Sequence, residues 1–359
     1  MKRLLFAAYS LDIGGIEKAL VTLANKLQEI GYDITIVLEK KQGVFLKEIN
    51  NKIHIIEYAP NESKNILKRK IINLFKRIMF ILKYKNKFDF SASFATYSIA
   101  ASFISRVTSK NSALWIHTDY LTLYRENTEK TKHFFKKINY KKFKRIIIVS
   151  KNAAKNFMKI FPNEKSKIMI CNNLVDYEKI KCLSNEFIGI KKDNNTTTFL
   201  NIGRHDEESK RLTRIIDASK MLAKDNFNFK VLFVGDGPDS NKYKNIVKQG
   251  NLGEYIKFLG KKENPYPYFK IADCVILTSE YEGYPVVFLE SLILNKPIIT
   301  TKVSDYQDIE GKFGYVTEKN SKDIYEKMKL FIENGYKTNS KFNAKEYNDQ
   351  IIKKLQSIF

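Results

Sequence analysis

The sequence has few cysteines and no long apolar run, and each absence excludes a class of protein. Its 359 residues include three cysteines, Cys171, Cys182 and Cys274. They are too few and too scattered for a disulfide framework, and they form no CxxC pair that would indicate a zinc site. We therefore expect a reducing, cytoplasmic environment and no bound metal. No apolar run reaches the roughly 18 residues that a membrane-spanning helix needs.

The N-terminus has only a superficial likeness to a signal peptide. Lys2 and Arg3 precede an apolar stretch, as in a secretory signal. That stretch is about seven residues long, however, and it runs into Asp12 and a pair of glycines with no cleavage-like site. We predict a first β-strand here instead.

Acidic residues are also scarce, above all in the first half of the chain. The chain has 63 Lys and Arg against 39 Asp and Glu, a formal net charge of +24. Residues 1–180 hold 34 of the basic and 15 of the acidic residues, a net charge of +19, and residues 181–359 hold the other 29 and 24, a net charge of +5. A basic half and a nearly balanced half indicate two domains, as does a length of more than twice roughly 150 residues.

Two segments concentrate the positive charge. Residues 64–88 hold nine Lys and Arg and no acid, and their apolar residues recur at helical spacing, which predicts a basic amphipathic helix. Residues 130–145 add eight basic residues among aromatic ones, and we expect them to form a second basic helix. Such helices suit the surface of an anionic membrane. The alternative for 64–88 is a helix that packs its apolar stripe on its own sheet and leaves a solvated basic face.

Nucleic acid is a competing anionic partner for so basic a chain. The sequence contains no zinc-finger spacing, no aromatic RNP signature and no basic-region heptads. We therefore expect no nucleic-acid partner, although a non-enzymatic nucleic-acid-binding protein stays open as an alternative.

Both halves alternate short β-branched or aromatic runs with amphipathic stretches, which is typical of parallel sheets with crossover helices. The predicted strands are 3–9, 33–38, 53–58, 88–94, 113–116 and 145–149, then 197–202, 230–234, 255–259, 274–278 and 298–300. The polar, aperiodic residues 185–196 are the predicted linker between a domain at 1–184 and one at 197–342, and a terminal helix at 343–359 is expected to pack back on the first domain. The fold class is therefore α/β, with two Rossmann-like, doubly wound domains that face each other across a cleft.

Ligand-binding residues in such domains follow the strands, and two candidates do so in the first half. Gly14 and Gly15 lie between the first strand and a helix, where backbone N–H groups can approach an anion closely. His117 ends the strand at 113–116 and can donate a hydrogen bond or share a proton. A plain turn and a structural histidine are the alternatives for these positions.

The first strand of the second half ends in a loop with two cations. Gly203 and Arg204 follow the strand, and Lys210 lies six residues after Arg204. Two fixed cations above a sheet are what a diphosphate leaving group needs if no metal neutralises it. The alternative is a solvated loop of mixed charge, since three acidic residues separate the two cations.

The most informative stretch follows the strand at 274–278. Glu282 lies in a glycine-containing loop, Pro285 stands where a helix should begin, and Glu290 lies inside that helix. The helix dipole and free backbone N–H groups can hold phosphate oxygens here, and Glu290 can accept hydrogen bonds from vicinal ribose hydroxyls. The N–H groups in question belong to Gly283, Tyr284, Val286 and Val287.

The E-x7-E spacing and the GYP motif of residues 282–290 resemble those of family 4 retaining glycosyltransferases of the bacterial surface-polysaccharide type. Gly14, Gly15, His117 and the loop at 203–210 fall where that family has counterparts. The resemblance implies a GT-B fold, a nucleotide-diphosphate sugar donor, no metal or other cofactor, and retention at the anomeric carbon.

The same resemblance implies a role for each site residue. Arg204 and Lys210 would contact the diphosphate, Glu282 the donor sugar and Glu290 the donor ribose, and His117 would lie near the transferred sugar and the acceptor. Donor binding would also involve Gly14, Gly15, Gly203 and residues 283–287. The sequence departs from the family where Arg211 replaces the usual glycine and where the Arg-to-Lys gap is one residue longer, which leaves open whether Lys210 or Arg211 reaches the phosphate.

The function expected from these features is transfer of a sugar from a UDP-sugar to a lipid-linked saccharide in capsule, O-antigen or exopolysaccharide assembly. The enzyme would be peripheral at the inner face of the plasma membrane, held there by residues 64–88 and 130–145. A GT-B sugar-nucleotide epimerase or hydrolase is the alternative enzyme. A dinucleotide oxidoreductase would need a GxGxxG motif after its first strand, and the sequence has none.

Overall fold

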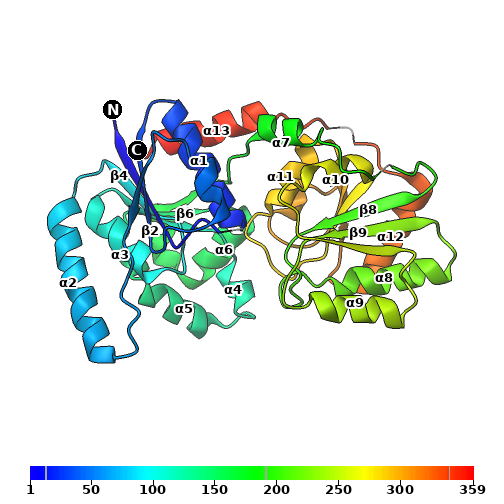
Figure 1. The fold of residues 1–359 in the computed structure, drawn as a ribbon, viewed down its shortest axis with the longest axis horizontal. Coiled ribbons are helices and arrows are strands. Elements are labelled where there is room, and N and C mark those ends of the chain that lie inside the picture. Colours follow the sequence, from blue (N-terminus) through cyan, green and yellow to red (C-terminus); the bar gives the residue numbers. More distant parts are fainter. Residues whose placement is uncertain (13, 191, 339) are drawn as a thin grey trace. The chain divides into compact units, whose positions relative to one another are not determined.

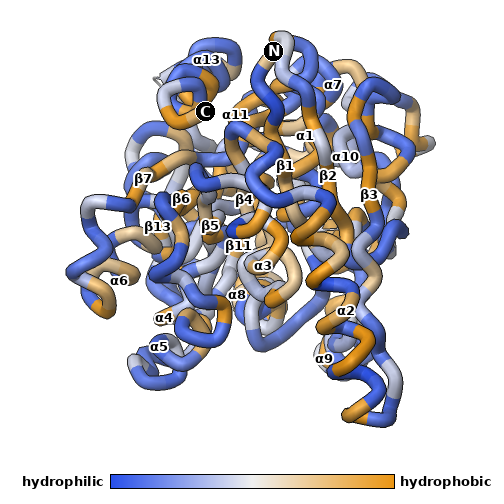
Figure 2. The backbone as a smooth tube through the Cα atoms, turned by 90° about the vertical axis from the view of Figure 1, so that its left-hand side faces the viewer, coloured by the Kyte–Doolittle hydropathy of each residue, from blue (hydrophilic) through white to orange (hydrophobic). Residues whose placement is uncertain are grey.

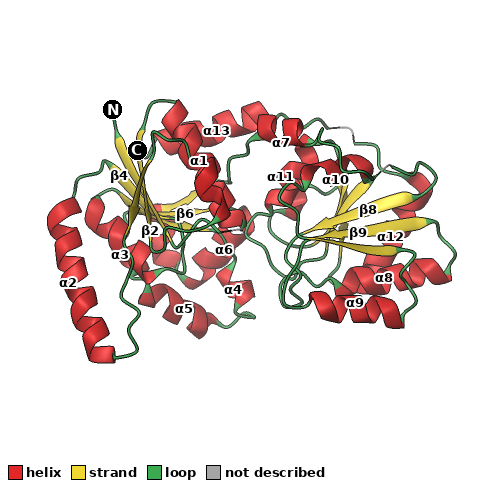
Figure 3. Cartoon of the chain, in the orientation of Figure 1, coloured by secondary structure: helices red, strands yellow, loops and turns green. Residues whose placement is uncertain are grey.

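The computed structural model describes residues 1–12, 14–190, 192–338 and 340–359, which form two compact units (Figure 1). The first unit comprises Met1–Leu174 and Tyr347–Phe359, and the second comprises Val175–Glu346. The division falls at Leu174, whereas the sequence places it at 184, so the predicted linker 185–196 belongs to the second unit. In both units helices flank a central sheet, as the colouring by secondary structure shows (Figure 3).

The first unit is built on a seven-stranded parallel sheet in the order β3-β2-β1-β4-β5-β6-β7. Its strands are β1 Arg3–Ala8, β2 Asp33–Leu38, β3 His54–Glu57, β4 Phe90–Ser93, β5 Ser112–Ile116, β6 Arg145–Ile148 and β7 Ile168–Ile170. The central strands are apolar on both faces because helices cover both sides, as parallel sheets require.

The helices of the first unit come from its N-terminal segment, apart from one at the end of the chain. They are α1 Gly15–Glu29, α2 Ile66–Tyr84, α3 Ile99–Thr108, α4 Tyr120–Leu123, α5 Thr128–Lys137, α6 Lys151–Ile160 and α13 Ala344–Gln356. In α1 the spacing of Leu20, Leu23 and Leu27 produces one apolar face, and all three side chains are buried.

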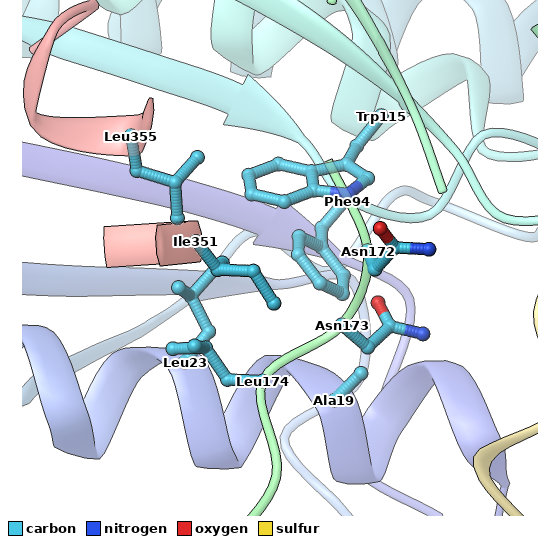
Figure 4. A pocket seen from close by; sticks show the side chains of 9 residues that line it. All are labelled: Ala19, Leu23, Phe94, Trp115, Asn172, Asn173, Leu174, Ile351 and Leu355. Atoms are coloured by element: carbon cyan, nitrogen blue, oxygen red, sulfur yellow. The ribbon is translucent and has the colours of Figure 1, made fainter. Parts of the chain in front are cut away.

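The end of the chain packs on the first unit. Leu355 of α13 is fully buried, and the Phe359 ring lies 4.9 Å from that of Phe90 on β4. The side chain of Asn111 donates a 2.6 Å hydrogen bond to the carbonyl of Ile358. A cavity of about 10 Å³, room for about one water molecule, remains where α13 meets α1 and the sheet, with Trp115 on its wall (Figure 4).

The second unit has a six-stranded parallel sheet in the order β10-β9-β8-β11-β12-β13. Its strands are β8 Thr197–Ile202, β9 Phe229–Val234, β10 Ile256–Gly260, β11 Cys274–Leu277, β12 Ile298–Thr301 and β13 Gly314–Thr317. Its helices are α7 Tyr177–Leu183, α8 Thr213–Lys224, α9 Ser240–Gln249, α10 Tyr266–Ile271, α11 Val286–Ile293 and α12 Ser321–Asn334. This strand order is the Rossmann order, so the α/β, Rossmann-like prediction for each half is confirmed.

Every predicted strand is present, but the sequence prediction misses β7 and β13. Both are edge strands of three or four residues with partly exposed side chains. Residues 130–145 are not one helix, which corrects the prediction. They comprise most of α5, a 3₁₀ turn at Tyr140–Lys142 and the first residue of β6.

The helices differ in length and hydropathy, and both properties bear on whether a helix can cross a bilayer. Within residues 1–12, 14–190, 192–338 and 340–359, no helix is both long enough and apolar enough to do so.

Candidate functional site

The candidate site in the second unit lies where the winding of its sheet reverses. The chain runs outward in one direction from β8 and in the other from β11, and these two strands are neighbours. Loops at the carboxyl ends of strands beside such a reversal form the usual ligand site of an open parallel sheet. The loop at 203–212 follows β8 and the loop at 278–285 follows β11, so both predicted diphosphate-binding loops start at this point.

Hydrogen bonds between these two loops fix them together. The Thr278 hydroxyl, at the end of β11, donates to the carbonyls of Lys210 and Arg211 at 3.2 and 3.1 Å. The backbone N–H of Glu280 donates to the carbonyl of Ser209 at 2.7 Å. The loop that carries the predicted cations is therefore held against the loop that carries Glu282.

Gly235 in the turn after β9 allows a third close contact. Its φ is +146°, and a Cβ atom at this position would lie 1.9 Å from the carbonyl oxygen of Gly203. Any larger residue would push the loop at 203–212 away from the sheet, so this turn, which carries little signal in the sequence, helps to set the site's position.

Lys210 and Glu282 form an ion pair at the centre of the site. Lys210 Nζ donates to Glu282 Oε1, and the Ser279 hydroxyl donates to the same oxygen at 2.7 Å. The Lys210 side chain passes over Gly203, where a Cβ atom would lie 3.7 Å from Lys210 Cε. Both charged side chains are mostly buried, with 25% and 15% of their surface exposed. The structure thus brings Gly203, Lys210 and Glu282 together.

Arg204 lies on the same loop but turns toward Asp206, with which it forms an ion pair. The Arg204 side chain is 68% exposed. Burial raises the pKa of Asp206, but the hydrogen bond from Arg204 and the backbone N–H groups of Ser209 and Glu208 outweigh it, and the net shift is downward. Arg204 is therefore a solvent-exposed cation already balanced by a charged carboxylate.

The structure places Arg211 away from Glu282. Its guanidinium faces Glu207, at 3.8 Å, and Glu280, at 3.6 Å. Burial raises the pKa of Glu280, but Arg214 and then Lys319 outweigh it and lower the pKa. Arg211 has a φ of +52°, in the left-handed region that favours glycine. Of the two cations, Lys210 is the one at the centre of the site.

The residues after Glu282 lead into α11 as the sequence predicts. Pro285 is the N-cap residue, and its side chain makes no capping hydrogen bond to the first-turn N–H groups of this helix. Gly283 and Tyr284 are buried, and burial raises the pKa of the Tyr284 phenol. Glu290 is 4% exposed, and the Tyr266 hydroxyl donates to its Oε1 at 3.3 Å.

In the first unit the predicted anion-binding turn at Gly14 and Gly15 lies against the acidic side chain of Glu17. Gly14 is the N-cap of α1, and a Cβ atom there would lie 2.1 Å from Glu17 Oε2. Burial raises the pKa of Glu17, its own backbone N–H lowers it in part, and Asp12 raises it further. The space beside Gly14 is therefore taken by the Glu17 carboxylate, while Gly15 begins the helix.

His117 follows β5 and is buried, with 7% of its surface exposed. Its ring lies 4.4 Å from that of Phe94 and stacks at 6.2 Å on Trp115. Neither ring nitrogen has a hydrogen-bond partner among the described residues. Burial lowers the pKa of His117 to about 3, so the imidazole is neutral at physiological pH.

Sequence reasoning missed three residues that the structure adds to the site. Ser279 and Tyr266 donate to the two glutamates, and Asp206 pairs with Arg204. Ser279 is three residues before Glu282, so its role could have been predicted from the sequence. Tyr266 lies 24 residues from Glu290 in the sequence, and only the fold brings the two side chains together. Within the described residues no group of three or more His, Cys, Asp or Glu side chains is arranged to hold a metal ion.

Two family models match the chain and together span most of its length. The model described as Glycosyltransferase Family 4 matches residues 13–179, and the model described as Glycosyl transferases group 1 matches residues 184–349. The chain belongs to the family 4 glycosyltransferases. This glycosyltransferase has the GT-B fold, as its solved structural neighbours do.

Several relatives of this glycosyltransferase are known. HepE of Anabaena, solved with UDP and glucose, superposes with a TM-score of 0.75 over 99% of this chain and 100% of HepE, at 17% identity. An N-acetylgalactosaminyltransferase of Campylobacter jejuni is 25% identical over 97% of this chain and 96% of its own. An uncharacterized glycosyltransferase of Methanocaldococcus jannaschii is 28% identical, over 59% of this chain and only 57% of that protein.

Proposed function

We propose that this glycosyltransferase moves a sugar from a UDP-sugar to a lipid-linked saccharide in capsule, O-antigen or exopolysaccharide assembly, with retention and without a metal ion. The enzyme would work as a peripheral protein at the inner face of the plasma membrane. HepE was solved with UDP, and the Campylobacter jejuni relative, by its name, acts on a diphospho-undecaprenol-linked saccharide. The net charge of +24 favours an anionic surface as the partner.

The observation that carries the proposal is the Lys210–Glu282 pair at the junction of the two loops. Lys210, paired with a glutamate three residues before the N-cap of α11, would offer a cation, and the first turn of α11 would offer backbone donors, to one diphosphate. When a diphosphate pairs with Lys210 in place of Glu282, the Glu282 carboxylate becomes available to accept a hydrogen bond from a hydroxyl of the donor sugar. Glu290, held by Tyr266, is placed one to two turns into the same helix for the ribose.

The proposed chemistry rests on charge stabilisation of the leaving group. Departure of UDP builds negative charge on its terminal phosphate, which Lys210, Arg204 and the amides of residues 283–287 stabilise. The acceptor hydroxyl attacks from the face that UDP leaves, and a phosphate oxygen takes its proton. We assign no covalent nucleophile, because attack on the same face as the leaving UDP, with a phosphate oxygen as the base, needs none. His117, being neutral, would act near the transferred sugar as a hydrogen-bond partner.

The proposal is tested by following sugar transfer to a polyprenyl-diphosphate-linked saccharide with a panel of nucleotide sugars. The expected result is transfer from a UDP-sugar that persists in excess EDTA, with an anomeric proton coupling in the product that matches the α or β configuration of the donor. Loss of activity in EDTA would contradict the metal-free chemistry. Inversion of the anomeric centre would contradict retention.

The same assay without acceptor separates the alternative enzyme. A sugar-nucleotide epimerase or hydrolase would release or convert the sugar at full rate with no acceptor present. The proposed transferase should consume the donor slowly under these conditions, because bulk water is a poorly placed nucleophile.

A further inference from the structure

The helix α2 of the first unit exposes its apolar side to solvent. Of its 19 residues only Phe80 is buried. The exposed apolar side chains recur every three or four residues and form one continuous stripe, which we call the α2 stripe. It consists of Leu67, Ile71, Leu74, Phe75, Ile78, Met79 and Leu82, each between 46% and 74% exposed. Figure 2 shows hydrophobic segments along the length of this helix.

The opposite side of α2 holds the helix on the unit. Phe80 packs against the rings of Tyr58 and Phe103 at 5.4 and 6.3 Å, and the Arg77 guanidinium lies 5.2 Å from the Phe103 ring. Asn73 exchanges hydrogen bonds of 3.0 and 2.7 Å with the backbone of Asn61. The helix is thus anchored by one aromatic and several polar side chains, and its orientation leaves the α2 stripe outward. The alternative in which this stripe packs on its own sheet is therefore wrong.

The charges around the α2 stripe select one class of partner. Residues 64–88 hold nine Lys and Arg and no acid. Of these, the exposed Lys68, Lys70 and Lys83 border the stripe at helical spacing, whereas Lys76 and Arg77 contact the unit. An apolar stripe with basic borders matches the acyl and headgroup layers of an anionic lipid surface. A second copy of α2 would bring like charges together with no acid to pair them, which disfavours self-association through this face.

The second basic segment lacks such a stripe. In residues 130–145 the aromatic side chains of Phe135, Tyr140 and Phe143 are 1%, 7% and 1% exposed, because they belong to the core around α5 and α6. This segment can attract an anionic surface through its lysines, but it has no comparable apolar side to bury in it.

We propose that α2 lies in the plane of an anionic membrane with the α2 stripe inserted among the acyl chains, and that residues 130–145 do not insert. The proposal deepens the membrane partner of the proposed function and rests on it only for the choice of lipid as occupant. A helix of 19 residues lying flat covers about 29 Å of surface.

The test measures flotation of the full-length protein with vesicles of phosphatidylcholine, with and without about a third phosphatidylglycerol. The stripe variant is Leu67→Ser, Leu74→Ser and Leu82→Ser. The matched control, Lys132→Gln, Lys136→Gln and Lys137→Gln, changes three exposed side chains of α5. We expect the stripe variant to lose at least about tenfold in partitioning and the control less than about threefold. All six positions are exposed, so unchanged thermal unfolding verifies that the variants fold.

Two further readouts separate insertion from adsorption. Binding of the wild-type protein should persist in about 1 M NaCl, where the Debye length is about 3 Å, whereas simple adsorption would be lost. A Phe75→Trp variant should gain a blue-shifted emission component on vesicles that brominated acyl chains quench, against the constant signal of the buried Trp115.

The proposal is overturned if the stripe variant floats like the wild-type protein, if the α5 control loses as much, or if Phe75→Trp is not quenched. It is also overturned if sedimentation shows a dimer that the stripe variant abolishes. None of these measurements uses a donor, so failure here with intact sugar transfer would leave the enzyme assignment standing. Vesicle insertion without transfer would leave only the insertion.

Discussion

In the candidate site of the second unit, each cation forms an ion pair with a different carboxylate. Lys210 meets Glu282 inside the junction of two loops, Arg211 meets Glu207 and Glu280 outside it, and Arg204 meets Asp206 near solvent. Each of these three cations is balanced by an acid of the chain itself. Binding of a diphosphate therefore exchanges one anionic partner for another, and the strength of the existing pair sets part of the affinity.

Neutralising Glu282 should separate binding of UDP from transfer. In Glu282→Gln the Lys210 ammonium loses its charged competitor, so we predict that UDP binds about three- to tenfold more tightly in a calorimetric titration. Turnover should fall, because Glu282 is the proposed partner of the donor sugar. The charge-matched control Glu254→Gln, on an exposed turn, should change neither quantity. Weaker UDP binding by Glu282→Gln would argue that Glu282 does not compete for Lys210.

The buried His117 should make the first unit sensitive to acid. Its pKa is about 3 in the folded protein and about 6.5 in an unfolded chain, so protons bind the unfolded chain more strongly. Its contribution to the free energy of unfolding is complete above about pH 6.5. It is lost as the pH falls from there toward 3, by about 2 kcal/mol at about pH 5.

We predict that His117→Asn flattens this pH dependence in urea unfolding between about pH 7 and 5. The control is His54→Asn, whose histidine is 72% exposed and should leave the slope as in the wild-type protein. An equal slope in His117→Asn and wild-type protein would show that His117 is not buried in its neutral form.

At the scale of elements, α13 closes the first unit, although it is the last helix of the chain. Leu355 is fully buried beside the cavity next to Trp115, and the chain has a single tryptophan. Leu355→Ala should therefore lower the free energy of unfolding reported by Trp115 fluorescence by about 2–5 kcal/mol.

The matched control for this prediction is Leu355→Met, which keeps the volume and should cost less than about 1.5 kcal/mol. A fluorescence midpoint that is the same for Leu355→Ala and the wild-type protein would contradict the packing of α13 on the first unit.

The central strands were predictable from the sequence because burial on both faces makes them continuous apolar runs. The β1 run LLFAA is wholly buried and could belong only to a central strand. Of the four edge strands, β3 and β10 were predicted, whereas β7 and β13 were missed because a partly exposed run of three or four residues gives little pattern. For residues 130–145 the regular spacing of lysines concealed a break between a helix, a turn and a strand.

For the candidate site, the order of the residues is visible in the sequence, but their backbone conformation and side-chain direction are known only from the fold. The order of Gly203, Lys210, Glu282 and Pro285 places them after strands, which the sequence predicts and the structure confirms. The choice between Lys210 and Arg211 depends on a left-handed backbone at Arg211, which spacing does not report. The outward direction of the α2 stripe likewise depends on Phe80 as the anchor.

At the scale of the whole molecule, the two units differ in charge as they differ in proposed task. The first unit, Met1–Leu174 with Tyr347–Phe359, holds 35 basic and 14 acidic residues, a net charge of +21, and the second unit, Val175–Glu346, holds 28 and 25, a net charge of +3. The basic unit presents α2 with its exposed stripe, and the nearly balanced unit holds the paired cations of the candidate donor site. The central claim is that this second site binds a nucleoside diphosphate through Lys210.

A titration of UDP into three proteins tests that claim most directly: the wild-type protein, Lys210→Met and Arg211→Gly. The account predicts that Lys210→Met weakens UDP binding by about 10- to 100-fold, the value of a hydrogen bond to a charged group. Arg211→Gly, which relieves a left-handed residue at an adjacent position, should stay within about threefold of the wild-type protein. Equal affinities for Lys210→Met and the wild-type protein, or a loss confined to Arg211→Gly, would contradict it.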